Sequence, residues 1–312
     1  MSKNILITGA AGFIGFNLAK RLSEKNFNLT LIDNLSRGRT DGDFKKLCKK
    51  KNVNFKNVDL TKSFILKKKF SHVFHLASIV GVKNVIKNPT KTLETNVKST
   101  LNLMKSISVK KTKIVFFSTS EVYSPLIKSK KKFFPSKEVD TLIIPRYPSK
   151  RDSYLISKLV IENIVTQSKH KSLIFRPHNI YGPRMGFAHV VPELIQKINK
   201  KKKCIVYSPN HSRAFCFIKD AIEQIIKLSF KESSYNKIYN IGNMNEEIKI
   251  LKLANLIKEK MKKDCFIAPG SITKGSQARR VPDMSKTQNQ IGKINYTNLS
   301  KGLDETIKWY LK

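Results

Sequence analysis

Short apolar runs recur through the first half of the chain and alternate with stretches whose apolar residues fall at helical spacing. Runs of four to six residues occupy positions 4–8, 29–32, 53–58, 73–77 and 113–117. Because these runs contain β-branched or aromatic residues and end at glycine or polar residues, they predict buried strands. Strands that alternate with helices build βαβ units, so we expect an α/β fold with a doubly wound parallel sheet.

The pattern loosens after residue 180, where prolines and glycines separate shorter elements. Residues 173–176 and 237–241 still have the character of sheet strands. We therefore predict a large sheet domain over residues 1–180 and a smaller α/β lobe over residues 181–312 that caps the ligand crevice. Segments near 213–242 are expected to return to the first domain.

Residues 89–107 predict a long helix with Asn96 near its middle. No apolar run reaches the roughly 20 residues that a membrane-spanning helix needs, and the N-terminus lacks the pattern of a signal peptide. We expect no membrane insertion. The inward face of the long helix is predicted to consist of Leu93, Val97, Leu101 and Met104.

Lysine dominates the charge of the chain. The 61 Lys and Arg residues against 22 Asp and Glu residues give a formal net charge of +39. The lysines form short clusters, such as 49–51 and 200–203, without interleaved aromatic residues or a recognition-helix motif. Together with abundant Asn and Ile, this composition is typical of A/T-rich codon usage. We expect salt-dependent adhesion to polyanions but no specific nucleic-acid partner.

Four cysteines are scattered along the chain, at Cys48, Cys204, Cys216 and Cys265, without a Cys-x-x-Cys pair or histidines at ligand spacing. This pattern favours reduced thiols over a disulfide framework or a metal site. We therefore expect a cytoplasmic protein without a bound metal.

The first apolar run ends in a glycine-rich turn that leads directly into a helix. Such a turn directs several backbone N–H groups and the positive end of the helix dipole at one place, which suits a pyrophosphate. Gly9 is expected to allow the tight turn, Gly12 the close approach of a phosphate, and Gly15 the packing of helix against strand. The turn therefore predicts a dinucleotide-binding, Rossmann-like sheet over residues 1–180.

Asp33 stands at the end of the second apolar run, where a carboxylate accepts hydrogen bonds from the adenosine ribose of a dinucleotide. Its charge would repel a 2′-phosphate, so NAD is the predicted cofactor. Arg37 and Arg39 follow in the next loop, and we expect them beside the adenine.

Tyr154 and Lys158 lie four residues apart and therefore on one face of a predicted helix. A tyrosine with a pKa near 10 is a poor base at neutral pH, but a nearby ammonium favours the phenolate. The pair is then able to remove a hydroxyl proton while hydride leaves for the cofactor. Thr119, at the end of a parallel strand, is expected to hydrogen-bond the same oxygen.

With these motifs in place, the chain resembles the extended short-chain dehydrogenases/reductases of the NAD-dependent nucleotide-sugar epimerase/dehydratase family. This resemblance implies a homodimeric enzyme that holds NAD and passes a nucleotide-diphosphate sugar through a 4-keto intermediate. The motifs that carry it are TGAAGFIG at 8–15, DNLSRG at 33–38, HLAS at 75–78, STSEVY at 118–123, YLISK at 154–158, RPHNIYGPRMG at 176–186, SRAFCFIKD at 212–220 and RRVPD at 279–283.

The resemblance also implies residue roles. Tyr154 is the base, Lys158 orients the nicotinamide ribose, and Thr119 completes the triad. The implied contacts of the sugar nucleotide are Ser120, Asn179, Arg213 and Arg280, and arginine forks are independently suited to a diphosphate. The implied NAD contacts are Gly9, Gly12, Phe13, Ile14, Gly15, Asp33, Asn34, Asp59, Leu60, Leu76, Ala77, Asn96, Tyr154 and Lys158.

The chain departs from the family pattern after the triad threonine. Ser124 stands where these proteins usually have glycine, and the interval from Thr119 to Tyr154 is long and contains the lysine-rich stretch Lys128–Lys132. This loop either overhangs the site or forms a solvated insertion.

Glu121 bears on which reaction the enzyme catalyses. A 4-epimerase needs no acid–base residue beyond the triad, whereas a decarboxylase or 4,6-dehydratase needs one near C5 of the sugar. The Ser-Glu after Thr119 resembles UDP-glucuronate decarboxylases and GDP-mannose dehydratases. Glu121 is therefore a candidate second base, although it is equally suited to stabilise a helix start. A buried carboxylate without a chemical role would carry a desolvation cost, so a lyase is favoured over the alternative, a 4-epimerase. An NAD-binding scaffold without activity is the alternative from another class.

Overall fold

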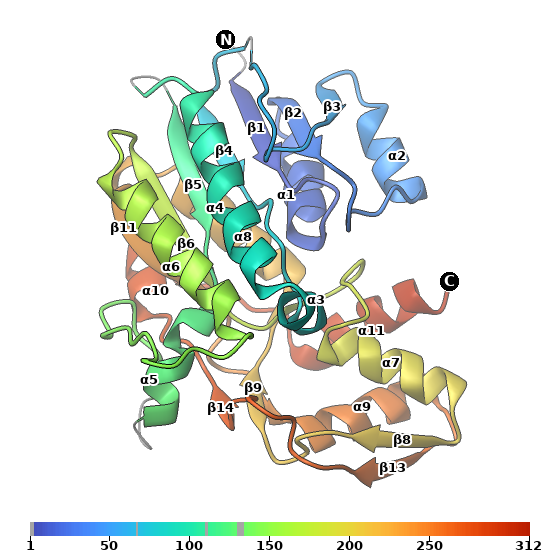
Figure 1. Cartoon of the computed structure of the whole chain (residues 1–312). Coiled ribbons are helices and arrows are strands. Elements are labelled where there is room, and N and C mark those ends of the chain that lie inside the picture. The colour runs from blue at the N-terminus through green and yellow to red at the C-terminus, as the bar shows by residue number, and fades with distance from the viewer. Residues whose placement is uncertain (1–2, 67, 110–111, 130–133) are drawn as a thin grey trace. The chain divides into compact units, whose positions relative to one another are not determined.

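The computed structural model describes residues 3–66, 68–109, 112–129 and 134–312. The chain divides into two compact units (Figure 1). Unit 1 comprises residues 1–122, 143–176 and 225–239, and unit 2 comprises residues 123–142, 177–224 and 240–312.

This division differs from the predicted boundary near residue 180, because the segment 123–142 lies in unit 2. Hydrogen bonds explain the difference. The Ser136 N–H donates to the Val281 carbonyl at 2.9 Å, and the Glu138 carboxylate accepts from the Asn240 N–H at 2.7 Å. The segment that returns to unit 1 is 225–239, shorter than the predicted 213–242.

Unit 1 is built on a seven-stranded sheet in the order β11-β6-β5-β4-β1-β2-β3, counted over the described residues. The ladders from β6 to β3 are parallel, as the alternation of strands and helices predicts. The strands are β1 (Asn4–Thr8), β2 (Asn28–Asp33), β3 (Val53–Asn57), β4 (His72–His75), β5 (Lys113–Phe117), β6 (Ser172–Pro177) and β11 (Lys237–Ile241). The helices before residue 170 are α1 (Phe13–Ser23), α2 (Gly42–Cys48), α3 (Val82–Lys87), α4 (Pro89–Lys105) and α6 (Asp152–Gln167), with a 3₁₀ turn, η1 (Ser120–Tyr123).

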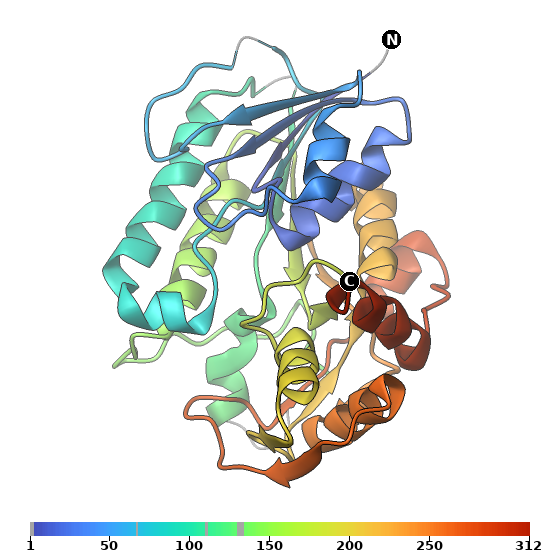
Figure 2. The same cartoon turned by 90° about the vertical axis from the view of Figure 1, so that its right-hand side faces the viewer.

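The strand order places a topological switch between β1 and β4, where ligands of open α/β sheets bind. The carboxyl ends of the two strands meet there, with Thr8 opposite His75. Figure 2 shows helices on both faces of the sheet, with α4 and α6 on one side and α1 on the other. We therefore expect a ligand at the carboxyl edge of the sheet, where β1 and β4 end.

Unit 2 consists of short elements. Its described strands form ladders β10-β7, β12-β9-β14 and β13-β8. The strands are β7 (Ile180–Tyr181), β8 (Lys203–Val206), β9 (Ser212–Ala214), β10 (Cys216–Phe217), β12 (Glu247–Lys249), β13 (Phe266–Pro269) and β14 (Arg279–Arg280). The helices are α5 (Ser124–Ser129), α7 (Val190–Lys200), α9 (Ile250–Met261), α10 (Ser285–Ile291) and α11 (Leu299–Tyr310). α8 (Ile218–Ser229) and the 3₁₀ turn η2 (Glu232–Ser234) continue the chain into the segment that returns to unit 1.

The predicted inward face of α4 is half wrong. Val97 and Met104 pack against the core, but Leu93 and Leu101 are 38% and 39% exposed. The buried face instead carries the polar residues Thr92, Asn96, Ser99 and Thr100, together with Leu103. α4 packs closely against α6 (Figure 1). Small hydrogen-bonding side chains therefore form much of its buried face, where hydrophobicity alone predicted leucines. Within the described residues no helix is both long and apolar enough to cross a membrane.

The glycine turn is closely packed. A Cβ atom on Gly15 would lie 2.2 Å from the Gly9 carbonyl oxygen, so α1 reaches the turn only because position 15 has no side chain. Gly42, in the first turn of α2, has no atom within 4 Å of the corresponding position.

We predict that Gly15→Ala lowers the free energy of unfolding by about 1–3 kcal/mol, because the added methyl group overpacks the turn. Gly42→Ala is the matched control, since the same methyl group enters open space in a helix and should be neutral or stabilising by up to about 1 kcal/mol. Urea unfolding of both variants measures the difference. Equal effects would contradict the packing role of Gly15.

Candidate active site

The turn between β1 and α1 has the features of a diphosphate cradle. Gly9 has φ +68°, and a Cβ atom there would lie 2.7 Å from the Ala77 nitrogen, so the turn passes tightly against the end of β4. α1 begins after Gly12 without a side-chain cap and without an acidic residue in its first turn, which contains Phe13 and Ile14. Its first N–H groups therefore point to the position where an anion binds.

Asp33, the last residue of β2, organises this turn. Its carboxylate accepts hydrogen bonds from the N–H groups of Ala11 at 3.0 Å and Leu35 at 2.8 Å. A carboxylate at this position of a dinucleotide-binding sheet accepts hydrogen bonds from ribose hydroxyls. Asn34 closes the following turn by accepting from the Ser36 N–H and hydroxyl at 3.1 and 2.8 Å. This geometry fits the adenosine half of NAD.

Asp59, predicted beside the adenine, also closes a turn. Its carboxylate accepts from the Thr61 N–H and hydroxyl at 2.9 and 2.8 Å, and the pKa of Asp59 is lowered mainly by the backbone bond. The neighbouring Leu60 is buried, and its carbonyl accepts from Asn102 of α4 at 2.9 Å.

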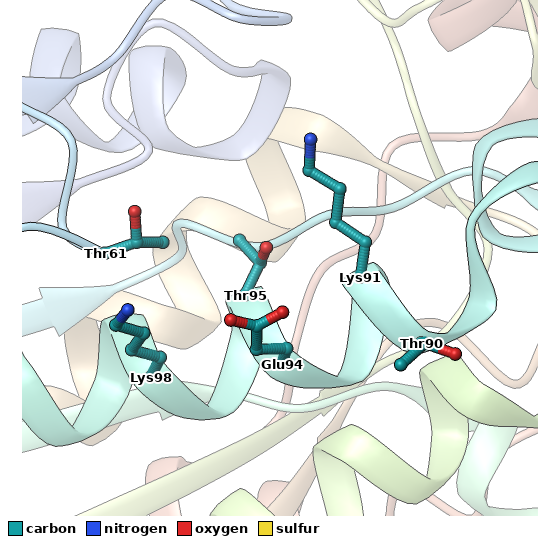
Figure 3. A pocket seen from close by; sticks show the side chains of 6 residues that line it. All are labelled: Thr61, Thr90, Lys91, Glu94, Thr95 and Lys98. Atoms are coloured by element: carbon teal, nitrogen blue, oxygen red, sulfur yellow. The ribbon is translucent and has the colours of Figure 1, made fainter.

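A hollow of about 440 Å³ lies beside this turn (Figure 3). Its lining residues are Thr61, Thr90, Lys91, Glu94, Thr95 and Lys98. Since none of the predicted NAD contacts lines it, the hollow is separate from the predicted cofactor site.

The structure brings the predicted triad together. Thr119 follows β5, Tyr154 lies in the first turn of α6, and their side chains are hydrogen-bonded. Burial raises the pKa of the Tyr154 phenol well above its usual range, whereas the bond from Thr119 and the charge of Arg37 lower it and Glu121 raises it. Without a ligand the phenol is therefore neutral.

Lys158 lies one turn along α6, with its Nζ atom 5.8 Å from the centre of the Tyr154 ring. The ammonium donates a hydrogen bond to the Phe117 carbonyl at 2.8 Å, and its side chain is buried. Burial lowers the pKa of Lys158 to about 7, while Glu162 raises it. The amine is thus poised to change its charge near neutral pH, and the backbone of β5 fixes its direction.

Arg37 links the loop after β2 to the residues after β4. Its Nη1 atom donates to the Val80 carbonyl at 2.7 Å, and its charge lowers the pKa of the Tyr154 phenol. The expected place of Arg37 beside the adenine stays a prediction. The contact with Val80 was not predictable from local sequence, since it joins two loops that are distant along the chain.

Glu121 has a cationic partner that sequence reasoning missed. Arg151, the N-cap of α6, places Nη2 at 3.2 and 3.4 Å from the two carboxylate oxygens of Glu121. Arg151 compensates the charge of Glu121, so the desolvation cost no longer argues for a chemical role of this carboxylate, and the role of Glu121 as a second base stays a prediction. Arg151 precedes Tyr154 by three residues. This helical spacing places both residues on one face of α6, and it was the signal in the sequence that Arg151 lies near the site.

Asn96 connects three parts of unit 1. It is buried, its amide oxygen accepts from the Ile79 N–H at 2.7 Å, and its amide nitrogen donates to Ser157 at 3.1 Å. Ser157 in turn donates to the Tyr154 carbonyl at 2.7 Å. Asn96 thus ties the loop after β4, α4 and the catalytic helix together, and its direct contact with NAD stays a prediction.

The remaining predicted contacts of unit 1 lie at strand ends. Leu76 donates its N–H to the Thr8 carbonyl at 3.2 Å, and Ala77 donates to the Thr8 hydroxyl at 3.3 Å. Ser120 is buried in η1. His75, expected to be a core residue, is buried between the hydroxyls of Thr8 and Thr100 with its pKa lowered by burial to about 3.

Unit 2 brings the predicted substrate residues together independently. Arg213 of β9 and Arg280 of β14 are paired in register on adjacent parallel strands. The Asn179 amide donates to the carbonyls of Ala214 at 3.0 Å and Arg280 at 3.2 Å, so it joins the same two strands. Like charges directly opposite each other on neighbouring strands are unfavourable. An anion such as a diphosphate would relieve that repulsion.

Two further sequence expectations concern the lysine-rich stretch and the cysteines. Of the lysine-rich stretch Lys128–Lys132, residues 130–132 lie outside the described part of the chain. All four cysteines are free, three of them buried and Cys48 partly exposed. Among the described residues, no group of three or more His, Cys, Asp and Glu side chains is placed to hold a metal ion.

The Rossmann-like fold and the predicted triad indicate the class of NAD-dependent enzymes. Comparison with known proteins identifies the family. Residues 5–242 match the model of the NAD dependent epimerase/dehydratase family. The chain therefore belongs to this family, which confirms the resemblance, the Rossmann-like α/β fold class, and NAD as cofactor.

Curated relatives are similar over the whole chain. A UDP-N-acetyl-alpha-D-glucosaminuronate decarboxylase from Bacillus cytotoxicus is 30% identical, with 99% of this chain and 98% of that protein covered. UDP-glucuronic acid decarboxylase 1 of Xenopus tropicalis is 29% identical over 99% of this chain and 72% of its own. The chain is thus an enzyme of nucleotide-sugar metabolism.

Solved structures share the fold. The UDP-N-acetylglucosamine 4-epimerase from Methanobrevibacter ruminantium superposes with a TM-score of 0.85 at 24% identity, covering 99% of this chain and 98% of its own. The UDP-glucuronic acid 4-epimerase from Bacillus cereus, solved with UDP-glucuronic acid and NAD, has a TM-score of 0.85 at 23% identity, with 99% of both chains covered.

We predict a pH-dependent contribution of Lys158 to stability in protein freed of NAD. Its pKa is about 7 when folded, against 10.5 for an unperturbed lysine, so between these values the folded state binds fewer protons than the unfolded state. The free energy of unfolding of the wild type, relative to Lys158→Met, should therefore rise by about 2 kcal/mol from about pH 7 to pH 9. Urea unfolding at both pH values measures this change. A difference that does not vary with pH would contradict the depressed pKa.

Proposed function

We propose that this enzyme decarboxylates a UDP-linked uronate sugar through a 4-keto intermediate. The observation that carries this choice is the full-length similarity to UDP-uronate decarboxylases, at 30% identity over 99% of the chain. The dehydratase alternative and the 4-epimerase alternative share the same fold, so the arrangement of elements does not separate them.

The proposed reaction starts at C4 of the sugar. Tyr154 takes the proton of the C4 hydroxyl, and Thr119 hydrogen-bonds the same oxygen, as their mutual hydrogen bond supports. NAD, when bound to the glycine turn and Asp33, supplies the hydride acceptor. Lys158 and Arg37 add positive charge around the phenol, which favours its ionised form.

Oxidation at C4 makes the C5 carboxylate that of a β-keto acid. When CO₂ leaves, the electron pair of the broken bond passes to C5 and the C4 oxygen, where Thr119 and Tyr154 stabilise the charge through hydrogen bonds. C5 would then take a proton from water, and Tyr154 would return its proton to the C4 oxygen as hydride returns from the bound cofactor to C4, so the reaction would be redox-neutral overall. Arg213 and Arg280 are proposed to hold the diphosphate.

The function is tested by product analysis in deuterated water. With UDP-glucuronate and UDP-N-acetylglucosaminuronate as substrates, we predict a product that has lost CO₂ and carries deuterium on C5. Tyr154→Phe should lower the rate by about 10²–10⁴-fold, because the proton acceptor is lost. A product of unchanged mass without carbon-bound deuterium would establish the 4-epimerase alternative, and loss of water would establish the dehydratase.

We further propose that the enzyme is a homodimer joined through α4 and α6. Three large apolar side chains are exposed on these two helices: Leu93 and Leu101 on α4 and Val160 on α6 are 38%, 39% and 40% exposed. Because α4 and α6 pack against each other, exposed apolar residues on both helices support a protein–protein contact.

We predict that Leu101→Glu converts the dimer to a monomer, because each subunit would bring a charge into the apolar contact. Leu311→Glu is the matched control, since Leu311 is 44% exposed but follows α11. Light scattering after size-exclusion chromatography gives the mass of each variant. A wild-type monomer, or a dimer that survives Leu101→Glu, would contradict the proposal.

We propose that the enzyme is located in the cytoplasm. The four cysteines without a disulfide support it, because oxidising compartments favour paired cysteines.

A further inference from the structure

The ion pair between Glu121 and Arg151 has an unusual geometry for an arginine and a carboxylate. A single terminal nitrogen, Nη2, approaches both oxygens, at 3.2 and 3.4 Å. A fork-to-fork pair would use two nitrogens at about 2.7–2.9 Å. The side chains are 20% and 19% exposed, so the pair is neither fully buried nor freely solvated. The geometry leaves other donors of the guanidinium directed away from Glu121.

Local hydrogen bonds fix the chain segments that carry Arg151 and Glu121. Arg151 lies within a turn in which the Asp152 carboxylate accepts from the N–H and hydroxyl of Ser149, both at 2.7 Å. The Glu121 N–H donates to the Thr119 hydroxyl at 3.2 Å. Because Thr119 also bonds Tyr154, Glu121 is two residues from a hydroxyl that contacts the phenol.

The pair is linked to the residues that are proposed to bind the C4 oxygen of the sugar. Thr119 and Tyr154 define where the C4 oxygen binds, and C5 is one bond of about 1.5 Å from C4. Glu121 is two residues from Thr119 and donates its N–H to the Thr119 hydroxyl at 3.2 Å, so its carboxylate is on the chain segment that carries a predicted ligand of the C4 oxygen. A C5 carboxylate bound there would meet Glu121 as a like charge and Arg151 as an opposite charge.

We propose that Arg151 recognises the C5 carboxylate of the substrate and that Glu121 orients Arg151 for this contact. The proposal rests on the proposed function, because only a uronate sugar carries this carboxylate. A guanidinium has five donors, so it holds Glu121 through one nitrogen and offers a second edge to the substrate. Glu121 then acts through Arg151 as a positioning residue, and Arg151 determines specificity for a uronate over a neutral hexose.

Binding measurements test the assignment directly. The protein carries Tyr154→Phe and is loaded with NAD, so that ligands bind without turnover. Titration calorimetry gives the Kd for UDP-glucuronate and for UDP-glucose, which differ only in the C5 substituent. Arg151→Gln removes the cation, Arg151→Lys keeps it, and Lys150→Gln is the matched control because it removes an exposed charge one residue earlier. Arg37→Gln is measured in parallel.

We expect Arg151→Gln to raise the Kd of UDP-glucuronate by about 10- to 100-fold, the range for a lost charged hydrogen bond, and to leave that of UDP-glucose unchanged. Arg151→Lys should recover part of the loss, and Lys150→Gln should have no effect. Equal losses for both ligands, or no loss, would overturn the assignment, as would a larger selective loss in Arg37→Gln. A wild type that binds both sugars but releases no CO₂ would overturn the proposed function instead, while the Kd ratio would still decide the role of Arg151.

Discussion

The ion pair between Arg176 of β6 and Glu162 of α6 is the interaction on which the catalytic helix depends. Two nitrogens of Arg176 contact the two oxygens of Glu162 at 3.0 and 2.7 Å, and both side chains are almost fully buried. A buried charge that loses its partner costs several kcal/mol, so α6 cannot slide along the sheet without breaking this contact. The pair therefore fixes the register of a helix that carries Arg151, Tyr154 and Lys158.

The catalytic chemistry follows from this placement. Once α6 is fixed, Lys158 meets the Phe117 carbonyl at the end of β5, Tyr154 meets Thr119, and Ser157 meets Asn96 of α4. These contacts join α6 to the end of β5, to the residue Thr119 that follows it, and to α4. α6 therefore lies against the carboxyl edge of the sheet, where the ends of parallel strands supply functional groups. This placement brings Tyr154 near Thr119, and Arg151 near Glu121.

The features that depend on local sequence were predictable. The glycine turn, Asp33 and the spacing of Tyr154 and Lys158 each follow from backbone geometry or helical period, and the strands fall within a residue or two of their apolar runs. The partners of Arg37 and Arg151 were not predicted, because they come from distant segments of the chain. Leu93 and Leu101 were assigned inward because hydrophobicity does not reveal that α4 packs on α6 through small polar side chains. The hydrophobic period of a single helix does not show which of its faces packs against a neighbouring helix.

The central claim is that Tyr154 initiates oxidation of a nucleotide-diphosphate uronate at C4. The most direct test is the absorbance of reduced nicotinamide during a single turnover of NAD-loaded enzyme mixed with UDP-glucuronate. Our account predicts a transient rise in the wild type, followed by a return to the oxidised cofactor as product forms, and no rise in Tyr154→Phe. A transient that persists undiminished in Tyr154→Phe, or product formed by the wild type without any reduction of the cofactor, would contradict it.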